Sequence, residues 1–285
     1  MAARPRTLPA AVAPVLVGTA LAIHVGPFHA LAFVAALVGA LMIQIGTNLS
    51  NDYSDARRGA DAEDRLGPVR VTAGGLVPPR QVLVATYVTF ALAVLCGVYL
   101  IAVAGWLLLA IGAASILAGV LYTGGPRPYG YEGLGELFVF LFFGIVAVSG
   151  SYFVQRKELP WEAFALAVPV GLLIAAILVV NNVRDLETDR RAGKRTLAVR
   201  LGRRNTRVMF VAMLAVAFAS GLVCWPADSL SPWLALTLLD IPLAVAIART
   251  VLTHTDGPSL NGALARTGIL ALTYCLLLAA GVLAS

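Results

Sequence analysis

The sequence predicts an all-α integral membrane protein, a bundle of nine transmembrane helices with two polar loops that cap its cytoplasmic end. Three observations predict this fold: an apolar composition, a succession of long apolar runs, and basic residues gathered on one side of the predicted helices. Of the 285 residues, 59% are hydrophobic and 13% are charged, against roughly 25% charged in an average soluble domain. The mean hydropathy is +0.86. This composition excludes an ordinary soluble enzyme.

The apolar runs, read with their Gly, Pro and charged interruptions, predict nine spans within one transmembrane domain of residues 1–285. Each run has close to the ~20 residues that cross a bilayer as a helix. The predicted spans are residues 8–25, 30–50, 81–103, 105–123, 134–154, 160–182, 207–225, 231–252 and 263–284. Asp240 falls inside the eighth span, and either a position near a helix end or a function would explain such a costly placement.

The basic residues fall almost entirely on one side of this nine-span arrangement. All of the 21 Lys and Arg except Arg156 and Lys157 lie on the side of the N-terminus. By the positive-inside rule, the N-terminus is expected to be cytoplasmic and the C-terminus to lie outside the cell membrane. The net charge of +6 follows from this asymmetry and requires no nucleic-acid partner.

Two long polar segments, residues 51–80 and 183–206, interrupt the apolar pattern and are expected to hold the chemistry. Related motifs mark their beginnings: NLSNDYSDARRGAD closes the second span, and NNVRDLETDRRAGKR closes the sixth. Four spans separate the two motifs, and an even number of crossings returns the chain to the same membrane face. Both motifs are therefore expected at one end of the bundle.

Acidic and amide side chains share one helix face in each motif, because residues three or four apart on a helix lie on the same side. The first face carries Asn48, Asn51, Asp52 and Asp55. The second face carries Asn181, Asp185 and Asp189. At least four carboxylates would then meet in one cavity, and cations are needed to balance their charge.

Magnesium suits such hard oxygen ligands, and proteins usually hold it with one or two carboxylates together with the phosphates of a substrate. The residues expected to hold Mg²⁺ are Asn48, Asp52, Asp55, Asn181, Asp185 and Asp189. Basic residues suited to phosphate oxygens follow each motif: Arg65 and Arg70 after the first, and Lys194 and Arg195 after the second. A structural alternative is that these acids and bases form ion pairs that only anchor the topology.

These motifs resemble those of the UbiA superfamily of intramembrane prenyltransferases, whose two aspartate-rich motifs bind magnesium and a prenyl diphosphate. Asn48 and Asp52, and likewise Asp185 and Asp189, match in order and spacing, whereas Asp55 lies one residue closer to Asp52 than in some relatives. The stretches GPVRVTAGG and LYTGGPRPYGYEGLGELFVFLFFG are similar to the 1,4-dihydroxy-2-naphthoate polyprenyltransferases of menaquinone synthesis. The resemblance extends over roughly residues 3–202.

The resemblance implies a prenyltransferase that joins a polyprenyl diphosphate to 1,4-dihydroxy-2-naphthoate, with loss of carbon dioxide and diphosphate, to give demethylmenaquinone. The residues that would act through Mg²⁺ are Asp52, Asp185, Asp189 and Asn48. Those that would contact a substrate are Arg65, Arg70, Tyr122, Arg127, Lys194, Arg195 and Arg6. The resemblance also implies a tunnel for the isoprenoid tail among the apolar helices.

Other functions remain open on the sequence alone. A related enzyme with a different aromatic acceptor would carry the same two motifs, because acceptor choice depends on the shape of the cavity. A cation-coupled transporter also places carboxylates in a helical bundle, but usually near the midplane of the membrane. A phospholipid-type phosphotransferase is expected to carry a single aspartate motif. The oligomeric state and the length of the prenyl chain are not specified by the sequence.

Overall fold

The computed structural model describes residues 4–59, 66, 70–224 and 230–285, and every regular element among them is helical. The α-helices are α1 (Pro9–Val25), α2 (Ala30–Arg57), α3 (Pro79–Ala104), α4 (Leu107–Leu121), α5 (Gly135–Val139), α6 (Ala147–Arg156), α7 (Trp161–Arg184), α8 (Leu186–Arg191), α9 (Leu197–Ser220), α10 (Ile241–Thr253) and α11 (Gly257–Leu283). Three 3₁₀ segments, η1 (Pro5–Thr7), η2 (Tyr129–Glu132) and η4 (Pro232–Asp240), and a π-helical segment, η3 (Phe140–Val146), complete the chain.

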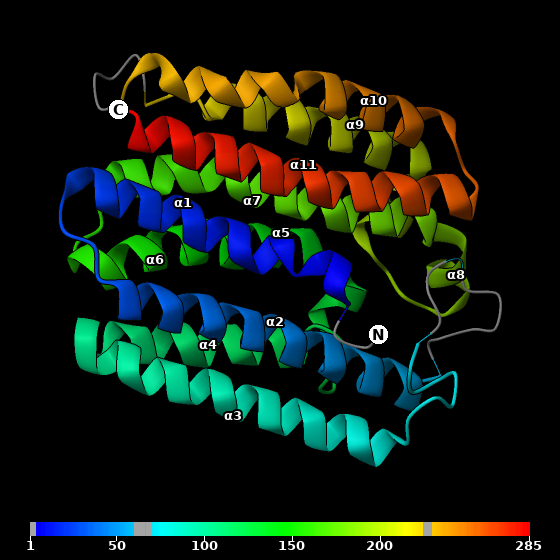
Figure 1. Ribbon diagram of the computed structural model, residues 1–285. Helices are drawn as coiled ribbons and strands as arrows, with labels where there is room; N and C mark the ends of the chain where they lie inside the picture. The colour runs from blue at the N-terminus through cyan, green and yellow to red at the C-terminus, as the bar shows by residue number, and fades with distance from the viewer. Residues whose placement is uncertain (1–3, 60–65, 67–69, 225–229) are drawn as a thin grey trace.

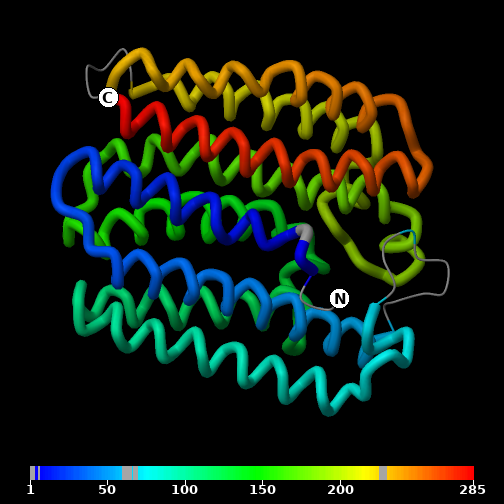
Figure 2. The backbone as a smooth tube through the Cα atoms, in the orientation of Figure 1, coloured from blue at the N-terminus to red at the C-terminus, as the bar shows by residue number. Residues whose placement is uncertain are grey.

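The long helices run alongside one another, with α1 and α7 in the middle of the bundle (Figure 1). Helix α1 packs against α11 and α6, and α7 packs against α9, α11 and η3, whereas α2, α3 and α4 form one edge. Helix α8 and the connection from α2 to α3 lie at the same end of the bundle, and the C-terminus lies at the opposite end (Figure 2). The elements that carry the two acidic motifs therefore meet at one end.

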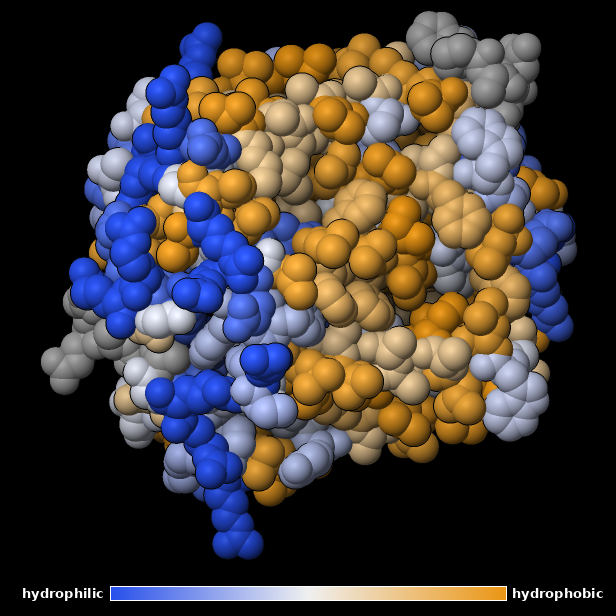
Figure 3. Space-filling model, turned by 180° about the vertical axis from the view of Figure 1, so that it is seen from behind, coloured by the Kyte–Doolittle hydropathy of each residue, from blue (hydrophilic) through white to orange (hydrophobic). Residues whose placement is uncertain are grey.

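A broad apolar surface separates two polar ends of the molecule (Figure 3). Within the described ranges, six helical segments are long and apolar enough to cross a membrane: Ala30–Arg57, Pro79–Ala104, Gly135–Arg156, Trp161–Arg184, Pro232–Thr253 and Gly257–Leu283. Helices α1 and α4 are apolar but shorter. Helix α9 begins with basic turns that include Arg203, Arg204 and Arg207. The prediction of an all-helical, membrane-spanning chain is confirmed for these six segments.

Several helices extend beyond the apolar runs that predicted them. Helix α2 continues to Arg57 although the predicted span ends at residue 50, and α9 begins at Leu197 although its span was expected from residue 207. The start of the first predicted polar loop and most of the second are thus helical, including the short helix α8. The end of α2 differs because backbone hydrogen bonds continue the helix through polar residues whose side chains have partners elsewhere. The start of α9 differs because a short helical piece precedes a kink at Gly202, whose backbone is not helical (φ 76°, ψ 162°). Asp52, Asp55 and Asp189 consequently stand on helices, and Asp185 lies where α7 ends and α8 begins.

Asp240 lies at the junction of η4 and α10, in the middle of an apolar segment. Its carboxylate accepts a hydrogen bond of 2.8 Å from the hydroxyl of Thr273 on α11. A residue of a neighbouring helix thus provides a hydrogen-bond donor for this carboxylate, at the point where the 3₁₀ segment η4 ends and α10 begins. Its environment indicates a structural role.

The π-helical segment η3 packs directly on the backbone of α7. A Cβ atom added to Gly144 would lie 2.6 Å from the Cα of Gly171 and 2.8 Å from the carbonyl oxygen of Ala167. Neither neighbour is a flexible side chain that can move aside. Contact at this distance fixes the position of the following helix α6 and of the preceding helix α5, which borders the site described below.

We expect Gly144→Ala to lower the unfolding midpoint in detergent, because overpacking of a tight contact costs about 1–3 kcal/mol. Gly150→Ala is the matched control, since a Cβ at Gly150 meets no atom within 4 Å. Thermal unfolding of the two purified variants checks this expectation. Equal midpoints for the two variants would show that the approach of η3 to α7 is not constrained.

Candidate active site

One cavity of about 890 Å³ connects the two acidic motifs and continues among the apolar helices. Helix α2 supplies an unbroken stripe of its wall from Ala36 to Asp55, a distance of roughly 28 Å at 1.5 Å per residue. The wall is polar where α2 ends. It becomes apolar toward Leu100, Leu108 and Val154. The cavity can therefore hold a molecule with a charged head and a long apolar tail.

Asp52 is held by the segment that follows the first motif. Its carboxylate accepts hydrogen bonds from the backbone N–H of Val71 at 3.2 Å and of Thr72 at 2.9 Å, and from the Thr72 hydroxyl at 2.5 Å. Only 2% of Asp52 is exposed. Val71 and Thr72 are thus tied to α2 through the Asp52 carboxylate.

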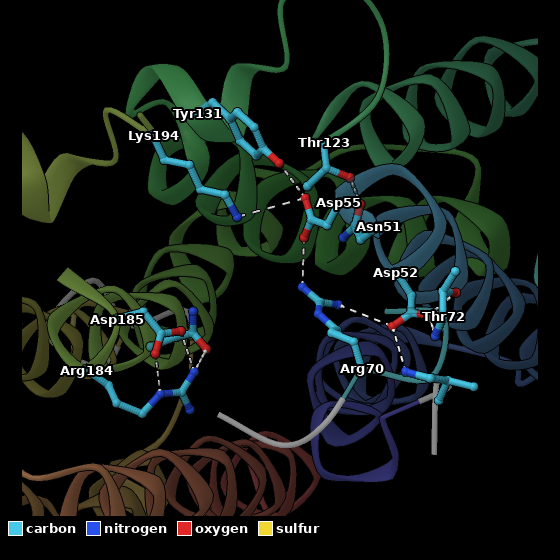
Figure 4. Close-up of polar contacts among 12 residues, drawn as sticks. Asn51, Asp52, Asp55, Arg70, Thr72, Thr123, Tyr131, Arg184, Asp185 and Lys194 are labelled. Carbon is cyan, nitrogen blue, oxygen red and sulfur yellow. Dashed lines mark hydrogen bonds and ion pairs between the residues drawn. The ribbon is translucent and has the colours of Figure 1, made fainter. Parts of the chain in front are cut away.

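Asp55 is the centre of a cluster that joins the two motifs (Figure 4). Its carboxylate pairs with the Arg70 guanidinium at 2.8 Å and accepts a hydrogen bond from the Tyr131 hydroxyl at 2.5 Å. The ammonium group of Lys194, which follows the second motif, lies 3.9 Å from Asp55 Oδ1 and 4.7 Å from the centre of the Tyr131 ring. The Lys194 contact therefore brings the two motifs together across the cavity.

Asp185 marks the break between α7 and α8, and it is paired with the residue before it. Arg184 donates to both carboxylate oxygens of Asp185, at 2.7 and 2.5 Å, and also to Asn181 Oδ1 at 2.8 Å. A third partner is Asn261 on α11, whose Oδ1 lies 2.6 Å from Arg184 Nη1. Asp189 remains in register with Asp185, because its N–H donates to the Asp185 carbonyl oxygen at 2.8 Å.

The chain itself balances the charge of the cavity. The acids on the wall are Asp52, Asp55, Asp185 and Asp189. The bases on the wall are Arg4, Arg70, Arg184 and Lys194. The expected excess of negative charge is therefore not observed among the described lining residues, because Arg70, Arg184 and Lys194 pair with the carboxylates. Of these three bases, Arg70 and Lys194 were predicted to meet phosphate oxygens.

The donors on the wall fit magnesium, since they are carboxylate and amide oxygens with neither His nor Cys among the described lining residues. Within the described part of the chain, no group of three or more His, Cys, Asp or Glu side chains is placed to hold a metal ion. A metal here would need oxygen atoms from a substrate or from water to complete its ligands. This agrees with the way Mg²⁺ is usually held with phosphates.

The remaining predicted residues occupy different positions. Asn48 lines the cavity and donates to the Thr7 hydroxyl at 3.2 Å, and Tyr122 also lines the cavity. Arg127 and the side chain of Arg195 are exposed and are not part of the wall. Arg65 and the side chain of Arg6 lie outside the described residues.

Several contacting residues were not predicted from the sequence. Thr72 and Tyr131 hold the carboxylates of the first motif, Arg4 and Thr7 border the cavity from the N-terminal segment, and Asn261 holds Arg184. A signal existed for Tyr131, because the YGYEG stretch clusters aromatic and acidic residues beside Tyr122. Asn261 gave no signal, since it lies alone on α11, far from either motif in sequence.

Aromatic side chains lead from the polar end of the cavity into its apolar part. Tyr122 meets Tyr129 edge to face at 5.5 Å, Tyr129 stacks on Phe138 at 4.1 Å, and Phe138 lies 6.1 Å from Phe142. A tyrosine side chain is uncharged at neutral pH. The ring faces can therefore contact cationic or unsaturated groups without carrying charge themselves.

A model of the UbiA prenyltransferase family matches residues 11–270. The chain belongs to this family. A 1,4-dihydroxy-2-naphthoate octaprenyltransferase of Mycobacterium tuberculosis is 44% identical over 280 residues, which are 97% of this chain and 94% of that protein. The resemblance that the two motifs indicated is thus confirmed, and the six apolar helices belong to a multi-pass membrane protein.

Solved structures of the family share this fold. The apo structure of a UbiA homologue from Aeropyrum pernix K1 has a TM-score of 0.72 at 15% identity and covers 97% of both chains. A UbiA homologue from Archaeoglobus fulgidus bound to GPP and Mg²⁺ has a TM-score of 0.67 at 15% identity, covering 99% of this chain and 98% of that one. The bundle is thus an architecture already known to occur in UbiA proteins.

We expect Asn261→Ala to destabilise the protein by about 1–3 kcal/mol, because it removes a partner of the buried Arg184 guanidinium. The amide control is Asn205→Ala on α9, whose exposed side chain bonds only the Leu201 carbonyl oxygen at 3.1 Å. Unfolding midpoints in detergent measure the difference. A midpoint for Asn261→Ala equal to that of Asn205→Ala would contradict a role for α11 in holding the second motif.

Proposed function

We propose that the chain transfers a polyprenyl group from a polyprenyl diphosphate to 1,4-dihydroxy-2-naphthoate, with Mg²⁺ as cofactor. Carbon dioxide and diphosphate are lost, and demethylmenaquinone is formed. The observation that carries this proposal is the single cavity in which Lys194 bridges the two acidic motifs at one end and apolar helices line the other. The name of the Mycobacterium tuberculosis relative supports the naphthoate as acceptor.

The paired charges of the cavity would exchange partners when the substrate binds. Asp52, Asp55, Asp185 and Asp189, assisted by Asn48 and Asn181, would hold the metal. Arg70 and Lys194, released from Asp55, would then donate to the phosphate oxygens. Bound Mg²⁺ would neutralise the negative charge that develops on the departing diphosphate. The bases share this load because they already lie beside the carboxylates, so little reorganisation is needed.

The rest of the cavity suits the prenyl group and the naphthoate ring, whose carbon atoms must come together. The apolar part of the α2 stripe would hold the isoprenoid tail, and Tyr122 with Tyr129 presents ring faces near the allylic carbon, where positive charge develops. The electron-rich carbon of the naphthoate ring would attack this allylic carbon. The chain needs to supply no nucleophile of its own.

The distribution of basic residues supports a topology of nine crossings within one domain of residues 1–285. The shorter helices α1 and α4, and the basic helix α9, would add three crossings to the six apolar segments. The N-terminus and the active site would then face the cytoplasm, with the C-terminus outside the cell membrane.

The proposal is tested by incubating the purified protein with Mg²⁺, a polyprenyl diphosphate and 1,4-dihydroxy-2-naphthoate, and measuring the prenylated, decarboxylated product. We expect Asp52→Ala and Asp185→Ala each to lower turnover at least about a hundredfold, since a preorganised electrostatic group is lost. Glu187→Gln is the control, because Glu187 is exposed and pairs with Arg190. Chelation of divalent ions should stop the wild-type reaction, and added Mg²⁺ should restore it. Full turnover by both Asp variants would refute the assignment.

The topology is tested with reporters fused at the C-terminus and at the connection between α6 and α7. An odd number of crossings places the C-terminus outside, so a phosphatase active only outside the cytoplasm should be active there. In the same arrangement the connection between α6 and α7, beside Arg156 and Lys157, also lies outside. The phosphatase fused there should therefore be active as well. Activity of a cytoplasmic reporter at the C-terminus would contradict nine crossings.

A further inference from the structure

Glu136 and Asn182 form a buried pair that is not among the residues expected to hold Mg²⁺, although Asn182 lies within the second motif. Asn182 Nδ2 donates to Glu136 Oε1 at 2.8 Å, with Glu136 on α5 and Asn182 on α7. The exposed fractions are 6% for Glu136 and 5% for Asn182. Burying a carboxyl group is costly, so its placement beside the cavity calls for an explanation.

The pair lies at the depth where bond formation must occur. Asn182 precedes Asp185 by three residues, so it lies about 4.5 Å farther along the helix axis from the carboxylate layer, on the tail side. Asn182 lines the cavity, as does Leu178 one turn deeper. The allylic carbon of a diphosphate held by the acidic motifs would occupy this layer, and the aromatic acceptor must approach it there.

The contact with Glu136 fixes which way the Asn182 amide points. A carboxylate oxygen only accepts hydrogen bonds, so the NH₂ group faces Glu136 and the carbonyl oxygen faces away. In the part of the chain that the structure describes, Asn182 Oδ1 makes no hydrogen bond, and Glu136 Oε2 is buried without a partner. Asn182 thus offers one hydrogen-bond acceptor to a ligand in the cavity.

An acceptor of this kind recognises an O–H donor. The naphthoate proposed above carries hydroxyl groups, whereas the allylic end of the prenyl group carries none. A hydrogen bond from a ring hydroxyl to an amide oxygen also increases the electron density that the hydroxyl oxygen donates to the ring. The same contact would therefore orient the aromatic substrate and favour its attack.

We propose that Asn182 accepts a hydrogen bond from a hydroxyl group of the aromatic acceptor, and that Glu136 is the positioning residue that fixes the Asn182 amide for this contact. This assignment rests on the proposed prenyl transfer. It concerns the acceptor half of the site, whereas the two acidic motifs concern the diphosphate half.

The test compares wild type, Asn182→Ala and Glu136→Gln for the KM of each substrate, with Asn205→Ala as the amide control. Loss of one hydrogen bond should raise the KM for the naphthoate about three- to tenfold. Equilibrium binding of polyprenyl diphosphate should remain within about twofold of wild type, since neither residue is among those proposed to hold the metal or the phosphate oxygens. Glu136→Gln keeps the shape of the side chain and should change KM in the same direction, because a glutamine amide can turn the Asn182 amide around.

A second arm uses acceptor analogues in which one hydroxyl at a time is replaced by hydrogen. For the analogue that lacks the hydroxyl contacted by Asn182, wild type should bind more weakly than it binds the parent naphthoate. Asn182→Ala should bind this analogue and the parent naphthoate equally well, because the variant has already lost the contact. An unchanged naphthoate KM in Asn182→Ala, or equal losses in wild type and variant for every analogue, would overturn the assignment of Asn182 alone. Failure of wild type to prenylate any naphthoate, with diphosphate binding intact, would instead overturn the proposed function and this inference with it.

Discussion

Each of the buried carboxylates Asp52, Asp55 and Asp185 has a donor or a cation as its partner, and for Asp52 and Asp55 these partners come from segments outside α2. Asp52 is held by backbone N–H groups after α2, Asp55 by Arg70, Tyr131 and Lys194, and Asp185 by Arg184. A buried charge without such partners would cost several kcal/mol. Satisfying these acids is therefore what draws the connection after α2, the η2 region and the segment after α8 to one end of the bundle.

The same contacts make the site responsive to a charged substrate. Arg70 and Lys194 already lie against carboxylates, so a diphosphate and its metal ions can replace each carboxylate–base pair with two new ion pairs without leaving any charge uncompensated. The bases are Arg and Lys in different settings: a forked guanidinium suits two oxygens at once, whereas an ammonium group acts as a point charge. The same charged side chains thus stabilise the fold and contact the substrate.

The sequence predicted the helices and the two motifs because both follow local periodic rules. Apolar runs indicate spans, and the spacing of Asn48 with Asp52, or of Asp185 with Asp189, indicates a shared face. It did not predict Asn261 or Thr72, because each acts through a contact between distant segments and has no local pattern. Helix ends were misplaced for a related reason: Asp52 and Asp55 are polar, yet they continue α2 because their partners come from elsewhere.

Buried polar groups in this bundle are of two kinds, and the difference separates structure from function. Asp240 meets Thr273 between two helices, away from the cavity, and such a contact has no room for exchange. Asn182 is also paired, but it lines the cavity and keeps its carbonyl oxygen unused in the described structure. Closed pairs of the first kind stabilise the contact between helices. A group of the second kind keeps an unpaired hydrogen-bond acceptor that a bound ligand can satisfy. Selection for stability alone would replace such a group, whereas selection for ligand binding explains why it is kept despite the cost of burying it.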